Sequence, residues 1–343
     1  MAAVVVSAPG RVCFAGEDID WISGPSILCA VDLRVVVTIT RRSGPFGELV
    51  IQSGDPFNVE RIFDWKALHT FSGHALDHIQ AAVKVASELT TSRESLLIHA
   101  DSNLPAGAGL ASSAAVITAT LTALSELWGL RLSTLQICEL AYRAEAGELR
   151  AGVGPMDFYA SALGGLLYIN SATSPPTTER LPFPSEVGLV VADTLVRRRT
   201  ADVIRWKRDR FERRDPSFLE YVRHTEHVVA RMRTALESMR PPEEIGALIC
   251  SCHEYLVRHM RVSTPLLDEC VATAVRAGSY GAKLTGTGMG GCAFALTPRN
   301  VTPAVLAAWE RLPVRPLDAT PSLAGVLVGK AQGRLLSPHW DVR

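Results

Sequence analysis

Two features that would point to a macromolecular or membrane partner are missing from this sequence. The 343 residues carry 35 Lys and Arg against 35 Asp and Glu, so no net charge favours nucleic acid or an anionic membrane surface. No apolar run reaches the roughly 18 residues that a transmembrane helix needs. The composition, 47% hydrophobic and 20% charged, is that of a folded globular chain long enough for two domains. We therefore expect neither nucleic acid nor membrane as a partner.

The sequence also lacks a basic leader and a regular cysteine pattern. Residues 1–6 read Met-Ala-Ala-Val-Val-Val and lead directly into strand-like sequence, which does not match a signal peptide. The seven cysteines are an odd number without regular spacing, which suits a reducing compartment better than a disulfide framework. We expect a cytoplasmic protein.

The most informative stretch is rich in small residues and runs from Leu104 to Ala115. It follows a short apolar strand candidate at 96–100 and leads into a helical pattern that extends to Trp128. Two glycines leave the backbone open to a ligand, and two serines stand where the helix begins. The free N–H groups and positive dipole at a helix start favour an anion, most readily nucleotide phosphates.

Other interpretations of this stretch are a tightly packed helix entry or a known nucleotide fingerprint. A dinucleotide-binding turn needs an acidic residue about 20 positions later at a strand end, but Glu126 lies inside the helical pattern. A Walker A loop needs Gly-Lys-Ser/Thr, which is missing. What remains is a phosphate loop of another kind.

The stretch resembles the second motif of the GHMP kinases, the family of galactokinase, homoserine kinase, mevalonate kinase and phosphomevalonate kinase, which reads Pro-x-Gly-x-Gly-Leu-x-Ser-Ser-Ala. Residues 8–21 resemble the first motif in its galactokinase form, Pro-Gly-Arg-x-x-x-x-Gly-Glu-His-x-Asp-Tyr, with Asp18 replacing His and Trp21 replacing Tyr. Residues 281–296 resemble the third motif, Lys-Leu-Thr-Gly-x-Gly-x-Gly-Gly-Cys. Taken singly, the first segment is also typical of a solvated acidic turn and the third of a hairpin.

Asp157 stands between Met and Phe in a largely apolar stretch, where a buried carboxylate needs a partner or a task. Taken alone, it would be a helix N-cap. The surrounding residues resemble the galactokinase stretch that contains the catalytic Asp, and Glu145 precedes Asp157 at the spacing of the family's magnesium-binding Glu.

The resemblance implies ATP-dependent phosphoryl transfer with Mg²⁺, and it carries roles onto matching positions. Asp157 and Arg11 would be catalytic, and Glu17, Asp18 and Asp20 would bind substrate hydroxyls. Glu145 with Ser112 or Ser113 would bind Mg²⁺. The ATP phosphates would be enclosed by Pro105, Gly107, Ala108, Gly109, Leu110, Ala111, Ser112 and Ser113 on one side and by Gly286, Thr287, Gly288 and Gly290 on the other.

Within the family, Arg11 and Asp20 favour a sugar, since mevalonate kinases carry Lys at the first position and lack the second. The implied product is a sugar 1-phosphate. Asp18 puts galactose itself in doubt, because a carboxylate accepts hydrogen bonds where His also donates them. An amino sugar, a deoxy or higher-carbon sugar, a cyclitol or a sugar phosphate remain open. An isoprenoid-alcohol kinase and a non-catalytic sugar and ATP sensor are the alternatives.

The resemblance implies an α+β, two-domain GHMP kinase fold with the active site between the domains. We expect a monomer or a homodimer. The polar, Pro-rich segment at 171–178 favours a boundary there, giving domains 1–175 and 176–343. The basic run from Arg197 to Arg214 is typical of a solvated helix face, or of a lid that contacts an anionic substrate. Periodicity predicts strands at 3–8, 33–41, 165–169 and 187–193, and helices at 74–90, 110–128, 133–150 and three times between about 216 and 278.

Overall fold

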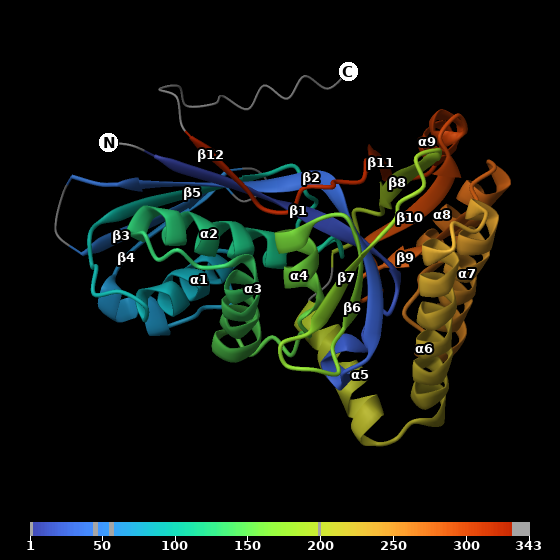
Figure 1. The fold of residues 1–343 in the computed structure, drawn as a ribbon, viewed down its shortest axis with the longest axis horizontal. Helices are drawn as coiled ribbons and strands as arrows, with labels where there is room; N and C mark the ends of the chain where they lie inside the picture. Colours follow the sequence, from blue (N-terminus) through green and yellow to red (C-terminus); the bar gives the residue numbers. More distant parts are fainter. Residues whose placement is uncertain (1–2, 44–46, 55–57, 198–199, 331–343) are drawn as a thin grey trace.

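Two β-sheets, each with its own helices, lie side by side in the computed structural model, which describes residues 3–43, 47–54, 58–197 and 200–330 (Figure 1). The first sheet contains β1 (Val4–Ala15), β2 (Pro25–Arg41), β3 (Glu48–Ser53), β4 (Val59–Asp64), β5 (Leu96–Ser102), β6 (Leu166–Asn170), β7 (Thr177–Leu181) and β12 (Leu327–Lys330). Its main order is β12-β1-β2-β5-β3-β4, with β6 also paired to β2 and β7 to β6. All neighbours are antiparallel except β3 and β5.

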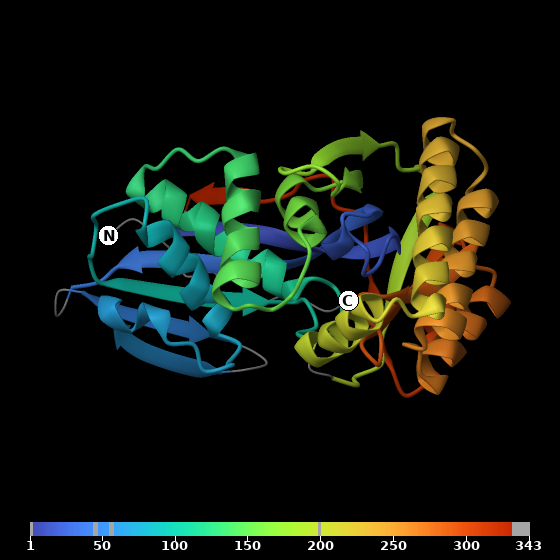
Figure 2. The same ribbon diagram turned by 90° about the horizontal axis from the view of Figure 1, so that it is seen from below.

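The first sheet is half-buried, as the sequence pattern of its long strand β2 requires. Leu33, Val35, Val37 and Ile39 are buried, while the residues between them are partly exposed. One face of the sheet is covered by helices (Figures 1 and 2). These are α1 (Asp77–Ser87), α2 (Ser112–Trp128), α3 (Thr134–Tyr142) and α4 (Met156–Leu163), with the π-helical turn η3 (Arg143–Glu148) between the last two and the 3₁₀ turns η1 (Asp20–Ile22) and η2 (Trp65–His69) in the loops.

The second sheet is antiparallel, in the order β11-β8-β10-β9. Its strands are β8 (Val187–Asp193), β9 (Gly281–Thr285), β10 (Cys292–Pro298) and β11 (Arg315–Asp318). The accompanying helices are α5 (Thr200–Glu212), α6 (Pro216–Glu237), α7 (Pro242–Tyr255) with the π-helical turn η4 (Leu256–Met260), α8 (Pro265–Arg276) and α9 (Thr302–Trp309). Proline stands in the first turn of α6 to α9, where its missing N–H costs no helical bond.

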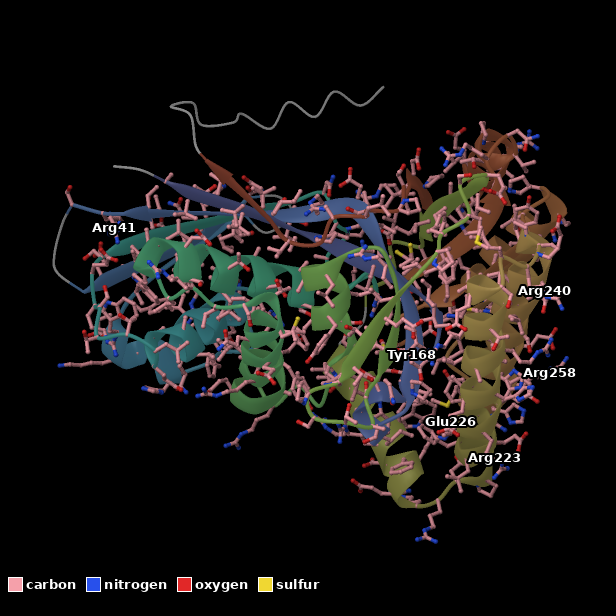
Figure 3. The ribbon with its side chains drawn as sticks, viewed as in Figure 1. Arg41, Tyr168, Arg223, Glu226, Arg240 and Arg258 are labelled. Atoms are coloured by element: carbon pink, nitrogen blue, oxygen red, sulfur yellow. The ribbon has the colours of Figure 1, made fainter. Side chains whose placement is uncertain are left out.

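The outer face of these helices meets solvent through charged side chains. Arg223, Arg240 and Arg258 are exposed on this face, as Figure 3 shows. Among the described helices, none combines the length and apolarity that crossing a bilayer requires.

The chain passes between the two sheets more than once. The first sheet includes β7, which follows the predicted boundary at residue 175, and β12, which returns to pair with β1 after the second sheet is complete. We call the first sheet with α1 to α4 the first unit, and the second sheet with α5 to α9 the second unit.

Most predicted elements are confirmed, but the helix predicted at 133–150 differs. It leaves α-geometry at Arg143 and continues as η3, whose wider turn holds Glu145. Single π turns change which face of a helix a side chain occupies and are frequent at functional sites. Strand β1 is also longer than predicted and continues to Ala15, with register shifts at Pro9/Gly10 and Cys13/Ala15.

Candidate active site

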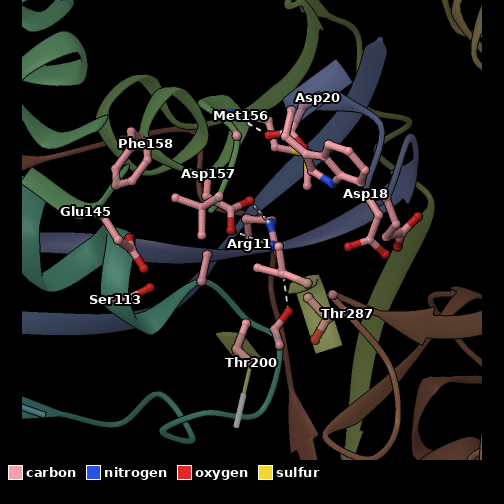
Figure 4. Close-up of a pocket in the computed structure, with 18 of the residues that line it drawn as sticks. Arg11, Asp18, Asp20, Ser113, Glu145, Met156, Asp157, Phe158, Thr200 and Thr287 are labelled. Atoms are coloured by element: carbon pink, nitrogen blue, oxygen red, sulfur yellow. Dashed lines mark hydrogen bonds and ion pairs between the residues drawn. The ribbon is translucent and has the colours of Figure 1, made fainter. Parts of the chain in front are cut away.

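A cavity of about 110 Å³ lies where the two units meet, and segments from both units line it (Figure 4). The first unit contributes an acidic turn (residues 17–21), a serine turn (residues 105–113), η3 and the start of α4. The second unit contributes α5 and a distal glycine loop (residues 286–291). The predicted residues that line the cavity are Arg11, Glu17, Asp18, Asp20, Gly107, Gly109, Ala111, Ser112, Ser113, Glu145, Asp157, Gly286 and Thr287.

The centre of the cavity is an ion pair between Arg11 and Asp157. Arg11 Nε lies 2.6 Å from Asp157 Oδ1, and Nη2 lies 2.7 Å from Oδ2, a bidentate geometry that fixes both groups. Arg11 Nη1 also donates to the Gly109 carbonyl at 2.6 Å. Burial opposes the charge on Arg11, but Asp157 outweighs it and raises the pKa of the guanidinium. Asp157 keeps a quarter of its side chain exposed, so the carboxylate remains within reach of a ligand.

Asp157 does not cap its helix. The N-cap of α4 is Pro155, and Asp157 lies in the first turn with its carboxylate on Arg11. The N-cap interpretation is therefore wrong, and the residue has a partner that a capping role would not supply.

The serine turn presents the start of α2 to the cavity. Ala111 precedes the helix with φ +60°, and its side chain makes no capping hydrogen bond. Ser112 and Ser113, the first residues of the helix, line the cavity, so this helix start is available to an anion. The distal glycine loop packs against this turn, where Cys292 N donates to the Ala108 carbonyl at 2.9 Å. A Cβ at Gly286 would lie 2.7 Å from Gly109 Cα, so the two backbones meet only because this residue is glycine.

Five predicted residues shape these two loops without lining the cavity. They are Pro105, Ala108, Leu110, Gly288 and Gly290. Their proposed contact with ATP would be through the loop backbone rather than through the cavity wall seen here.

Glu145 projects from η3 beside Ser113, on the opposite side of the Arg11–Asp157 pair from Asp18 and Asp20 (Figure 4). Its Oε1 lies 3.7 Å from His78 Nε2. Burial raises the pKa of Glu145 despite the opposing effects of His78 and Ser113. The Glu145 carboxylate and the serine hydroxyls of the serine turn are oxygen ligands of the kind that fits Mg²⁺.

The three acidic residues of the acidic turn line the cavity, but they differ in their partners. Glu17 is paired with Lys283, and Asp18 is paired with Lys207. Asp20 has no cationic partner among the described residues and accepts from the Met156 N–H at 3.2 Å.

Burial and the nearby Asp157 raise the pKa of Asp20 to about 7. A Cβ at Gly154 would lie 2.1 Å from Asp20 Oδ2, so the Asp20 carboxyl group can occupy this position only beside a glycine.

Sequence reasoning missed the two buried lysines that hold the acidic turn. Lys207 belongs to the basic run, and the expectation of a solvated face is wrong there, since its side chain is fully buried. Arg205 on the same helix does meet solvent, with 73% of its side chain exposed. Lys283 opens the third motif, but its partner Glu17 lies 266 residues away, and no local signal pairs them.

Comparison with known proteins matches the chain to three family models. The model for the GHMP kinases N terminal domain matches residues 77–165, that for GHMP kinases C terminal matches residues 232–313, and a galactokinase galactose-binding signature matches residues 1–41. Mevalonate kinase of Pyrococcus horikoshii is 32% identical over 307 residues, covering 86% of this chain and 89% of that protein. The chain belongs to the GHMP kinases.

Other GHMP kinases show that similarity extends to more than one activity. Galactokinase of Pyrococcus furiosus is 28% identical over 327 residues, covering 88% of this chain and 90% of that protein. The structure of Lactococcus lactis galactokinase complexed with galactose superposes with a TM-score of 0.81 at 18% identity, covering 96% of this chain and 95% of that one. This last likeness confirms the predicted two-domain GHMP kinase fold. The chain is thus a kinase of a family that uses ATP and acts on small molecules, including sugars and mevalonate.

Proposed function

We propose that this GHMP kinase transfers the γ-phosphoryl group of ATP to a hydroxyl of a sugar or sugar-like acceptor. The observation that carries the proposal is the Arg11–Asp157 pair, which lies between the uncapped start of α2 and the acidic turn. A phosphate bound at the helix start and a hydroxyl at the acidic turn would meet at this pair.

Each step of the transfer has a residue suited to it. Asp157 accepts the proton of the acceptor hydroxyl while the oxygen of that hydroxyl forms a bond to the γ-phosphorus. The bond between the γ-phosphorus and the ADP oxygen breaks, and ADP leaves. Arg11 keeps Asp157 in place and offsets charge on the transferred group. Backbone N–H groups from Gly107 to Ser113, with the distal glycine loop opposite, enclose the phosphates.

A divalent cation fits beside these groups. Glu145 and Ser112 or Ser113 would hold Mg²⁺ through oxygen, the ligand type that this ion prefers. When bound, it neutralises phosphate charge and orients the terminal group. The remaining steps belong to the side chains named above.

A sugar acceptor, phosphorylated at its anomeric hydroxyl to give a sugar 1-phosphate, is favoured by two observations. Residues 1–41 match the galactose-binding signature, and Asp20 offers an acceptor-side carboxylate without a cationic partner among the described residues. The identity to a mevalonate kinase supports an isoprenoid alcohol as the second candidate. A non-catalytic sugar and ATP sensor is the third, and the retained Arg11, Glu145 and Asp157 weigh against it.

Release of ADP from Mg·ATP tests these candidates directly. The purified protein is incubated with neutral sugars, amino and deoxy sugars, cyclitols, sugar phosphates and mevalonate, and ³¹P NMR locates the new phosphate. We expect ADP release with a sugar or cyclitol. Release with mevalonate alone would select the isoprenoid kinase, and nucleotide binding without release for any acceptor would select the sensor.

A further inference from the structure

Lys207 places one buried ammonium against two parts of the site that are distant in the sequence. Its Nζ pairs with the Asp18 carboxylate and donates to the Thr287 carbonyl at 2.7 Å. Asp18 belongs to the acidic turn, and Thr287 belongs to the distal glycine loop. A single charged group therefore contacts both the proposed acceptor side and the proposed nucleotide side of the cavity.

The helix that carries Lys207, α5, also makes direct contacts with the first unit. Thr200 and Ile204 of α5 line the wall, and Arg208 follows one turn later on the same face. Arg208 donates to the Gly152 carbonyl from Nε at 3.1 Å and from Nη2 at 2.7 Å, and its guanidinium lies 4.7 Å from the centre of the Trp21 ring. These contacts hold the position of α5 relative to the first unit.

Burial makes the Lys207–Asp18 pair hard to separate. Lys207 is fully buried and Asp18 is 6% exposed, so the two opposite charges attract strongly in a low-dielectric site, and moving them apart is costly. A displacement of Asp18 therefore moves Lys207, and Lys207 is bonded to the backbone of the distal glycine loop.

We propose that Lys207 is a positioning residue that couples the acidic turn to the distal glycine loop, so that a change on the acceptor side alters nucleotide affinity. The inference rests on the proposed function of the same cavity. It departs from a simple hydroxyl-binding role for Asp18, because a carboxylate that only contacted the acceptor would leave nucleotide affinity unchanged.

The test is a calorimetric titration of Mg·AMP-PNP without any acceptor. The proteins are the wild type, Asp18→Asn, Lys207→Met and the double variant. We expect each single substitution to raise the Kd by about fivefold or more, the lower end of typical coupling between sites. The double variant should match a single variant, because residues in one network are not additive. Arg205→Met, on the exposed side of α5, is the control and should keep the wild-type Kd.

Two results would overturn the coupling: singly substituted proteins within twofold of the wild-type Kd, or effects that add in the double variant. Thermal melts set a titration temperature at which every protein is folded. Should Lys207→Met not fold, the comparison is between Asp18→Asn and the double variant, which removes both charges of the pair and should show the same Kd as Asp18→Asn. A wild type that fails to bind Mg·AMP-PNP would reject the proposed function itself, whereas tight binding and turnover with unresponsive variants would reject only the coupling.

Discussion

Two cation–carboxylate pairs in this cavity differ in what can reach them. Arg11 and Asp157 form a bidentate pair whose carboxylate is a quarter exposed, whereas Lys283 and Glu17 are sealed at 0% and 1% exposure. An accessible carboxylate can exchange a proton with a ligand, while a sealed pair contributes only to the position of its neighbours. We therefore propose a chemical role for the first pair and an assembly role for the second, in place of the substrate contact that the resemblance implies for Glu17.

The sealed pair joins the two units. Lys283 Nζ also donates to the carbonyls of Cys13 at 3.1 Å and Leu284 at 2.8 Å, so β9 is bonded to the end of β1. Tyr221 of α6 adds a further bond, in which its hydroxyl donates to the backbone carbonyl of Glu17 at 2.7 Å. Burial raises the pKa of Glu17 although Lys283 opposes this effect.

The largest effect is expected for Asp157→Asn. Loss of the proton acceptor should lower kcat by about 10²–10⁴-fold, the usual contribution of a general base. Asn keeps the size of the side chain, so Mg·AMP-PNP affinity should stay near wild type. Steady-state ADP release and calorimetry measure the two quantities, and turnover within threefold of wild type would remove Asp157 from the chemistry.

Lys283→Met should instead lower the free energy of unfolding. Removing one member of a buried pair costs about 3–5 kcal/mol, and adding Glu17→Gln should recover part of the loss. Urea denaturation measures it. Arg223→Met, which removes a cation from an exposed pair with Glu220, is the matched control and should change stability by less than about 1 kcal/mol. Equal losses of stability for Lys283→Met and Arg223→Met would contradict the assembly role.

Asp20 sharpens the comparison through pH. Its pKa is about 7 in the folded protein, so the folded state holds a proton that the unfolded state releases near pH 4. The contribution of Asp20 to stability therefore falls as the pH rises from about 4 through 7 and is lost above that range. Asp20→Asn should raise the free energy of unfolding at pH 8 by a few kcal/mol, given about 1.4 kcal/mol per pKa unit.

The gain from Asp20→Asn should shrink toward zero at pH 4, as followed by urea denaturation at pH 8, 6 and 4. A gain that is independent of pH would show that Asp20 is not protonated in the fold.

Glu145→Gln should have the smallest effect, confined to the metal requirement. Amide oxygen is a weaker ligand than carboxylate, so the Mg²⁺ concentration for half-maximal activity should rise on the order of tenfold. Glu139→Gln, an exposed change on the preceding helix, is the control. An unchanged Mg²⁺ titration for Glu145→Gln would place the metal elsewhere.

The sequence predicted the site residues whose signal is local and missed those whose partners come from the other unit. Gly107, Ser112 and Ser113 stand in one short turn that matches a family motif, and the structure places all three in the wall of the cavity. Lys207 is indistinguishable in sequence from Arg205 two positions earlier, yet the fold buries one and exposes the other. Such pairs form through contacts across the cavity, which composition and periodicity do not encode.

The fold shows the same division between local and distant signals. Strand alternation and helix periodicity predicted elements such as β8 and α2, because each is set by a single buried face. The return of β12 to β1 depends on pairing across more than 300 residues. The π turn brings Glu145 to within 3.7 Å of His78, a contact between distant residues that helix periodicity does not predict.

A crystal structure of the protein with Mg²⁺ and AMP-PNP tests the central claim most directly. The account predicts phosphates over the start of α2, enclosed by the distal glycine loop, with the terminal phosphate beside Asp157 and the metal on Glu145. A nucleotide bound away from the Arg11–Asp157 pair, or a terminal phosphate directed away from Asp157, would contradict it.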